Sequence, residues 1–209
     1  MALVKYNNNS ISAVTATGLA SGSLVHIKTL TASSSATLSF VHGTDGVVLD
    51  STYPIYQFEF INIHSSSDGY SFEFNLSTDG GSNYNVTKTS TAFYTYHLEN
   101  DTDSGLAYNA SSDLAQSTSY QRFIYNIGNG NDESGSGSLQ LFNPSSTTYV
   151  KHFIGTNNSN QSNDYSTNSY IAGYGNTTSA VDAIRFQMQS GNIDSGKIKL
   201  YGIKDSWWA

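Results

Sequence analysis

Apolar and polar side chains alternate along most of this chain, and this two-residue period restricts the possible fold more than any other feature. In Tyr70–Ser77, the positions of Tyr70, Phe72, Phe74 and Leu76 are apolar, and the positions between them are polar or charged. Successive side chains of a strand point to opposite faces of a sheet, so the pattern is typical of a half-buried β-strand.

The same period recurs along the sequence between turns rich in Gly, Asn, Asp and Ser. Residues 56–60 alternate in this way, and residues 67–69 would connect them to 70–77, so we predict an antiparallel hairpin. Further strands are predicted over residues 24–30, 36–41, 121–127, 138–142, 147–154, 183–189 and 197–203. Many short strands joined by such turns predict an all-β, antiparallel, jelly-roll-like β-sandwich.

The chain of 209 residues is expected to form one domain. Within it we expect shorter N-terminal strands over residues 1–50, the main sandwich over 51–203 and a C-terminal tail over 204–209. Residues 155–169 are rich in Asn and Ser, which favours a surface loop. Residues 101–117 are also expected to be a loop, with room for one short helical turn.

The charge of the chain argues against a nucleic-acid partner. It carries 9 Lys and Arg against 16 Asp and Glu, a net charge of −7, and only Arg122 and Arg185 are arginines. Phosphate recognition needs clustered cations, which this sequence lacks.

Membrane insertion and secretion are not expected either. No window reaches the roughly 18 apolar residues of a spanning helix. Lys5 and the asparagines at positions 7–9 interrupt any apolar run of a secretory signal, so we expect synthesis in a host cytoplasm without a signal peptide. The chain has no cysteine, which excludes disulfides and thiolate metal ligands.

No catalytic motif stands out, and we predict no catalytic site, no metal site and no cofactor. The histidines are far apart in the sequence and are expected to be ordinary half-buried side chains: His26, His42, His64, His97 and His152. Asp101 and Asp103 resemble the opening of a calcium loop, but the later ligands of that loop are missing, and calcium binding stays an open question at this point. Glu59 and Glu73 would lie on neighbouring strands, where two outward surface carboxylates are the simpler interpretation.

Tyrosine is the most suggestive residue type, with 15 copies. Tyr165, Tyr170 and Tyr174 lie in or beside the Asn- and Ser-rich segment, close to Asn168. An aromatic face flanked by amide and carboxylate groups is a common way to hold a sugar, so these four residues are the predicted ligand-binding site.

The two ends of the chain carry apolar residues that a solvated tail would not need. Leu3 and Val4 lie near the N-terminus, and Trp207 and Trp208 lie at the C-terminus. Large exposed apolar groups usually mark an interaction, so we expect these four residues to make assembly contacts.

The last third of the chain resembles a known family. Residues 182–186 (DAIRF), 190–193 (SGNI) and 195–203 (SGKIKLYGI) are similar to a C-terminal signature of tailed-bacteriophage virion proteins, especially those of marine phages. Residues 1–8, 77–84 and 141–144 extend the resemblance over nearly the whole chain. Members of that family usually stop near the position of Ile203, so no role for the tryptophans is carried over.

The resemblance implies a structural component of a phage particle and carries no catalytic residues. We therefore expect a non-enzymatic virion surface protein, similar to a tail-fibre or receptor-binding protein, that adheres to host surface glycans. Its expected partners are other virion proteins and copies of itself. The first alternative is a decoration protein that binds the capsid lattice, and a remote alternative is a glycan depolymerase.

Overall fold

The computed structural model describes residues 23–205, and all regular secondary structure in this part of the chain is β-strand. The strands are β1 Leu24–Thr31, β2 Thr37–Val41, β3 Ile55–Ser65, β4 Tyr70–Ser77, β5 Lys88–Leu98, β6 Ser104–Tyr108, β7 Gln121–Ile127, β8 Gly135–Phe142, β9 Lys151–Asn160, β10 Tyr165–Gly175, β11 Ala183–Met188 and β12 Ile193–Ile203. Every pairing between them is antiparallel.

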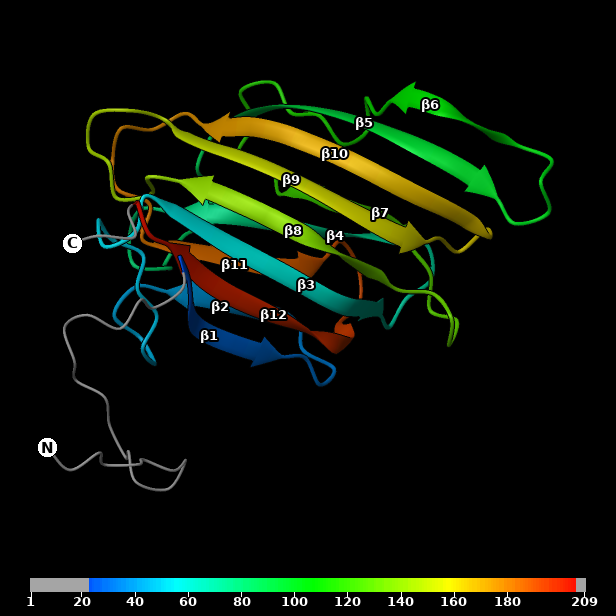
Figure 1. The fold of residues 1–209 in the computed structure, drawn as a ribbon, viewed down its shortest axis with the longest axis horizontal. Helices are drawn as coiled ribbons and strands as arrows, with labels where there is room; N and C mark the ends of the chain where they lie inside the picture. The colour runs from blue at the N-terminus through cyan, green and yellow to red at the C-terminus, as the bar shows by residue number, and fades with distance from the viewer. Residues whose placement is uncertain (1–22, 206–209) are drawn as a thin grey trace, which may run out of the picture.

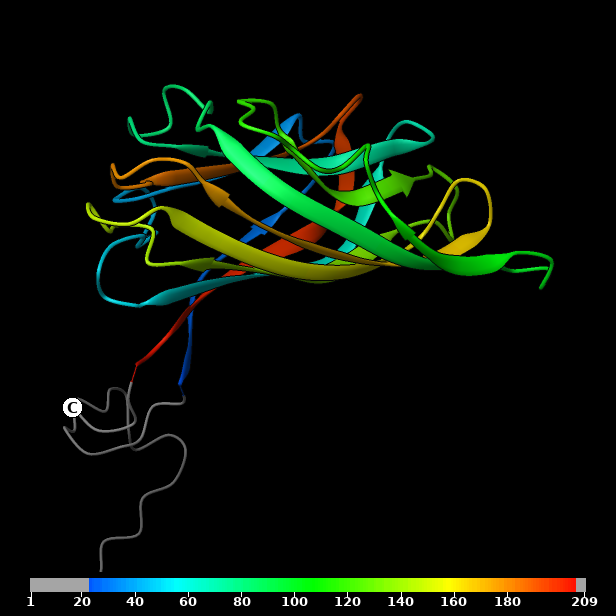
Figure 2. The same ribbon diagram turned by 90° about the horizontal axis from the view of Figure 1, so that it is seen from above.

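The strands form two sheets that pack face to face, as Figure 1 shows from the front and Figure 2 from above. The larger sheet has the order β1-β12-β3-β8-β9-β10-β5-β6, and the smaller has the order β2-β11-β4-β7. The prediction of an all-β antiparallel sandwich is therefore confirmed. The two strands from the first fifty residues, β1 and β2, form one edge of each sheet.

An aromatic cluster fills the space between the sheets. Phe186 on β11 lies at its centre, and its ring centroid is 5.2–6.3 Å from five other phenylalanine rings. These rings belong to Phe40, Phe58, Phe60, Phe72 and Phe74, and the two sheets contribute them together. Most of the contacts are tilted or edge-to-face, which is the geometry that aromatic pairs prefer.

The predicted hairpin between residues 56–60 and 70–77 is wrong. β3 pairs with β12 and β8 in the larger sheet, whereas β4 pairs with β11 and β7 in the smaller one. The chain crosses the sandwich between them, so the rings of Phe60 and Phe72 meet across the core at 5.5 Å. Alternation predicts which side chains of each strand point into the core. It does not predict whether two such strands pair within one sheet or lie in opposite sheets with the core between them.

The expected surface loop at residues 155–169 is also wrong. This segment belongs to β9 and β10, which pair with each other from Lys151–Gly175 to Asn160–Ser166. The inward positions of both strands carry small polar side chains at this end, so the apolar–polar contrast that marks a strand is missing. These inward side chains are Asn157, Ser159, Thr167 and Ser169, and all four are buried.

Residues 88–108 contain two strands that the sequence interpretation missed. β5 pairs with β10 over its whole length, and β6 pairs with β5 inside the region expected to be a loop. β6 forms the free edge of the larger sheet, and the turn between β5 and β6 projects to the right in Figure 1 and Figure 2.

The strand registers define two opposite ends of the sandwich. At one end Leu24 pairs with Ile203, and the amide of Lys204 donates to the carbonyl of Ser23, so the described chain starts and stops at the same place. At the other end Ser159, Thr167 and Tyr96 lie in one row across β9, β10 and β5. The predicted assembly residues at positions 3, 4, 207 and 208 (Leu3, Val4, Trp207 and Trp208) lie outside the described residues.

Candidate functional site: a tyrosine pocket at one end of the sandwich

The four predicted ligand-binding residues all lie on β10, but they do not form one site. Tyr165 shares the inner face of the sheet with buried Thr167, whereas Asn168, Tyr170 and Tyr174 point to the outer face. The strand period separates them, since odd and even positions face opposite sides. The loop expected around them is therefore corrected to a strand with two distinct faces.

Tyr165 contributes to a pocket of about 320 Å³ at the end of the sandwich opposite to residues 23 and 204. We call it the tyrosine pocket, and its lining comprises Tyr94, Tyr96, Asp103, Tyr125, Asn126, Gln161, Asn163, Tyr165 and Thr167. These residues come from β5, β7, β10 and the turns β5–β6 and β9–β10. Strands and turns that are distant in the sequence therefore build the pocket together.

The four tyrosines form a continuous series of ring contacts. The ring centroids of Tyr165 and Tyr96 are 5.7 Å apart, those of Tyr96 and Tyr94 are 5.6 Å apart, and those of Tyr94 and Tyr125 are 6.5 Å apart. Tyr96 lies over Gly105 of β6, where a Cβ atom would be 2.8 Å from the Tyr96 hydroxyl. The missing side chain at that position leaves room for the ring.

Amide side chains line the other wall because β7 is irregular at its end. Its pairing with β4 shifts register, so Tyr125 and Asn126 bulge out opposite Ser71. Asn126 has a φ of 56°, a left-handed conformation that asparagine tolerates better than most residues. Its amide Nδ2 lies 3.4 Å from the Gln161 Oε1 and 3.3 Å from the Asn163 Oδ1. A bulge re-aims side chains, and here it brings polar groups next to the tyrosines.

The pocket has one carboxylate, Asp103, and no lysine or arginine in its lining. The Tyr165 hydroxyl donates to the Asp103 Oδ2 at 2.8 Å, and this bond raises the pKa of Tyr165. Burial raises the pKa of Tyr94, with smaller contributions from Tyr125 and Tyr96. Tyr94 and Tyr165 therefore carry neutral hydroxyl groups at physiological pH, and the only formal charge at the rim is negative.

The outer face of the same strands carries an exposed apolar patch. Five large side chains there are at least 41% exposed, and we call them the outer patch: Phe93, Leu106, Tyr108, Ile154 and Tyr170. The rings of Phe93 and Tyr170 stack at 4.9 Å, and the Asn168 amide donates to the Tyr170 hydroxyl at 3.0 Å. Tyr174 lies farther along β10 beside a shallow slot of about 440 Å³. Contiguous exposed apolar groups of this kind mark a contact surface.

The two glutamates considered as a catalytic pair lie on different sheets. Glu59 is on β3 and accepts a hydrogen bond from Gln57, whereas Glu73 is on β4 and accepts one from Gln187. Burial raises the pKa of Glu73, which lines a pocket of about 460 Å³ with Tyr120 and Arg122. Glu73 is the one carboxylate in that lining, and glycoside hydrolysis commonly uses two. The prediction that the two glutamates lie on neighbouring strands is wrong.

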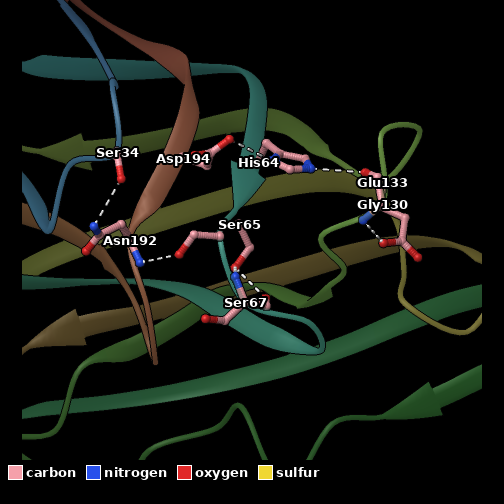
Figure 3. A network of polar contacts seen from close by, with 9 residues as sticks. Ser34, His64, Ser65, Ser67, Gly130, Glu133, Asn192 and Asp194 are labelled. Atoms are coloured by element: carbon pink, nitrogen blue, oxygen red, sulfur yellow. Dashed lines mark hydrogen bonds and ion pairs between the residues drawn. The ribbon is translucent and has the colours of Figure 1, made fainter.

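A histidine at the end of β3 and an aspartate at the start of β12 meet, as Figure 3 shows. His64 Nδ1 lies 3.4 Å from the Asp194 carboxylate, and its Nε2 lies 3.0 Å from the Gly130 carbonyl oxygen. The neighbouring Ser65 hydroxyl donates to the Ser67 carbonyl instead of the imidazole. Both ring nitrogens thus face acceptors other than a serine, and the arrangement joins β3, β12 and the β7–β8 loop rather than forming a nucleophilic triad.

The acidic turn between β5 and β6 separates its two aspartates. Asp101 lies 3.1 Å from His97 Nε2, whereas Asp103 bonds to Tyr165 in the tyrosine pocket. Within residues 23–205, no group of three or more His, Cys, Asp or Glu side chains is placed to hold a metal ion. The same range contains no helix long and apolar enough to cross a membrane.

Sequence reasoning identified Tyr165 and missed its partners Tyr94, Tyr96 and Tyr125. The run from Tyr94 to Leu98 alternates in the strand period, which is the signal that could have placed Tyr94 and Tyr96 on one face. Alternation alone predicts Tyr125 on the same side as Phe123 and Ile127, but the local bulge aims it into the pocket.

Comparisons with known proteins gave no match: no family model, no curated protein and no solved structure is significantly similar to the chain.

Proposed function

We propose that this chain is a non-enzymatic surface protein of a bacteriophage virion that binds host surface glycans through the tyrosine pocket. The pocket itself carries the glycan part of the proposal, because it combines four tyrosine rings with amide, hydroxyl and carboxylate groups. Aromatic rings stack on the apolar face of a sugar, and polar side chains at the rim bond its hydroxyls. The virion part is supported by the resemblance of residues 182–203 to the phage signature.

The position of the pocket supports display on a particle. It lies at the end of the sandwich opposite to residues 23 and 204, where the described part of the chain starts and stops. Attachment to a particle at the end that carries residues 23 and 204 would leave the pocket directed outward. A homo-oligomer would in addition cover the free edge of β6.

Tyr165→Ala is expected to weaken glycan binding by about tenfold or more, since truncating a central aromatic contact costs about 1.4 kcal/mol or more. The measurement is binding of the purified full chain to immobilised host surface polysaccharide. Tyr170→Ala is the matched control, because it removes the same side chain from the outer face of the same strand. Equal losses in both variants, or none in either, would argue against the pocket.

The outer patch favours a second function, a decoration protein that binds the capsid lattice. Its five apolar side chains lie on one broad face rather than at a loop end, which suits docking on a protein surface. Leu106→Ser together with Tyr108→Ser is then expected to release most of the protein from particles while leaving glycan binding unchanged. Immunogold labelling of intact virions checks the two functions directly: label at the tail supports adhesion, and label over the head supports decoration.

A further inference from the structure

Buried polar atoms without partners concentrate beneath the tyrosine pocket. Within residues 23–205, seven buried side-chain nitrogen or oxygen atoms lack a hydrogen-bond partner, and five of them lie on β9 and β10. These five are Asn157 Oδ1, Ser159 Oγ, Asn160 Oδ1, Thr167 Oγ1 and Ser169 Oγ. Buried polar groups in proteins are nearly always bonded, so a cluster of exceptions calls for a specific cause.

The strand register places four of these residues in a row on the inner face. Ser159 pairs with Thr167, and Asn157 pairs with Ser169 one step farther from the pocket. The row starts at Thr167, which is 1% exposed and lines the pocket, and it continues toward the core.

The smaller sheet covers this row but does not supply the missing hydrogen bonds. β7 packs against β9 and β10, and the Asn157 amide donates to the carbonyl of Phe123, which lies at a register shift in the pairing of β7 with β4. β7 makes no hydrogen bond to the amide oxygen of Asn157, nor to the hydroxyls of Ser159, Thr167 and Ser169. Thr167 therefore combines a desolvated hydroxyl that has no partner with a place in the lining of the pocket.

The charge of the lining restricts what that ligand can be. Asp103 is its one charged side chain, and the chain as a whole has a net charge of −7. An anionic ligand in this pocket would meet a carboxylate with no cation to offset it, whereas an uncharged ring would meet only donors and acceptors.

We propose that the tyrosine pocket binds the uncharged terminal ring of a glycan, with the Thr167 hydroxyl bonding a ring hydroxyl and Asp103 selecting against rings that carry a carboxylate. This inference rests on the proposed glycan-binding function and adds to it a sugar class and two specificity-determining residues.

Matched sugars test the selectivity. The probes are printed oligosaccharides that end in glucose or glucuronate, or in galactose or galacturonate, so each pair differs only at C6. Uncharged ends are expected to bind at least about fivefold more tightly at low salt, and Asp103→Asn is expected to reduce that ratio below about twofold. Equal or tighter binding of the uronate ends would overturn the inference and leave glycan binding intact. Binding to neither end would instead contradict the proposed function.

Thr167→Val tests the buried hydroxyl by a substitution of nearly the same shape. Binding of the uncharged ends is expected to fall at least about tenfold, while the melting temperature rises because an unpartnered buried oxygen is removed. Thr156→Val is the matched control, because Thr156 is exposed on the outer face of β9 and should change neither quantity. Unchanged sugar binding in Thr167→Val, with the fold intact, would show that this hydroxyl does not contact the ligand.

Discussion

Phe186→Ala is expected to lower the free energy of unfolding by about 4 kcal/mol, the middle of the range for truncating a buried aromatic side chain. Phe186 is completely buried at the centre of the smaller sheet, and five phenylalanine rings surround it. Truncation would remove the favourable free energy of burying the ring. It would also leave a cavity, because the surrounding rings are fixed in two different sheets and cannot move in to fill it. Urea unfolding followed by far-ultraviolet circular dichroism measures the loss.

Phe93→Ala is the matched control for this prediction. Phe93 is 41% exposed on the outer face and packs mainly against Tyr170. Its truncation is expected to cost about 1 kcal/mol, the value of one aromatic contact and partial burial. Similar losses for the two variants would mean that the aromatic cluster between the sheets does not dominate the stability of this fold.

Lys88→Met is expected to abolish most of the pH dependence of stability above neutrality. Lys88 is completely buried on β5, and burial lowers its pKa to about 7. Its ammonium group donates to the Asn75 Oδ1 and to the Val86 carbonyl, and no carboxylate is among these partners. At pH 7 a methionine would avoid the desolvation of the charge, so the variant is expected to be more stable by about 2 kcal/mol.

The direction of the pH effect follows from proton binding. Between about pH 7 and 10.5 the unfolded chain holds a proton on Lys88 that the folded chain has lost, so wild-type stability rises with pH by about 1.4 kcal/mol per unit. Burial also lowers the pKa of Lys151, which adds a contribution of the same sign. Tyr56 acts in the opposite sense above pH 10, because burial raises its pKa to about 12 and favours its neutral form in the fold.

Unfolding free energies measured at pH 7.5, 8.5 and 9.5 test this account. Wild type is expected to gain about 2.5 kcal/mol over the range, and Lys88→Met much less. Lys197→Met, which removes an exposed lysine from β12, should retain the wild-type slope. A wild-type stability that stays constant over these pH values would show that Lys88 is protonated in the fold.

Local patterns were sufficient to locate strands wherever inward and outward residues differ in polarity. β4 and β7 begin and end at the residues that alternation indicated, and Ile184, Phe186 and Met188 are buried as expected. Alternation gave no signal in the second half of β9 and the first half of β10, where the inward residues Asn157 and Thr167 are as polar as the outward ones. The segment in which inward and outward residues differ least in polarity is the one that forms the polar row beneath the pocket.

The sequence by itself determined that this chain is all-β and which face of most strands is buried, because successive side chains of a regular strand point to opposite faces. Tertiary structure alone decided which sheet each strand joins. That choice placed β3 and β4 on opposite sides of the core, and it brought Tyr94, Tyr125 and Tyr165 into one pocket. Such pairings join segments that are tens of residues apart in the sequence. Their free energy depends on how all the strands pack together, and a local alternation of polarity carries no information about that packing.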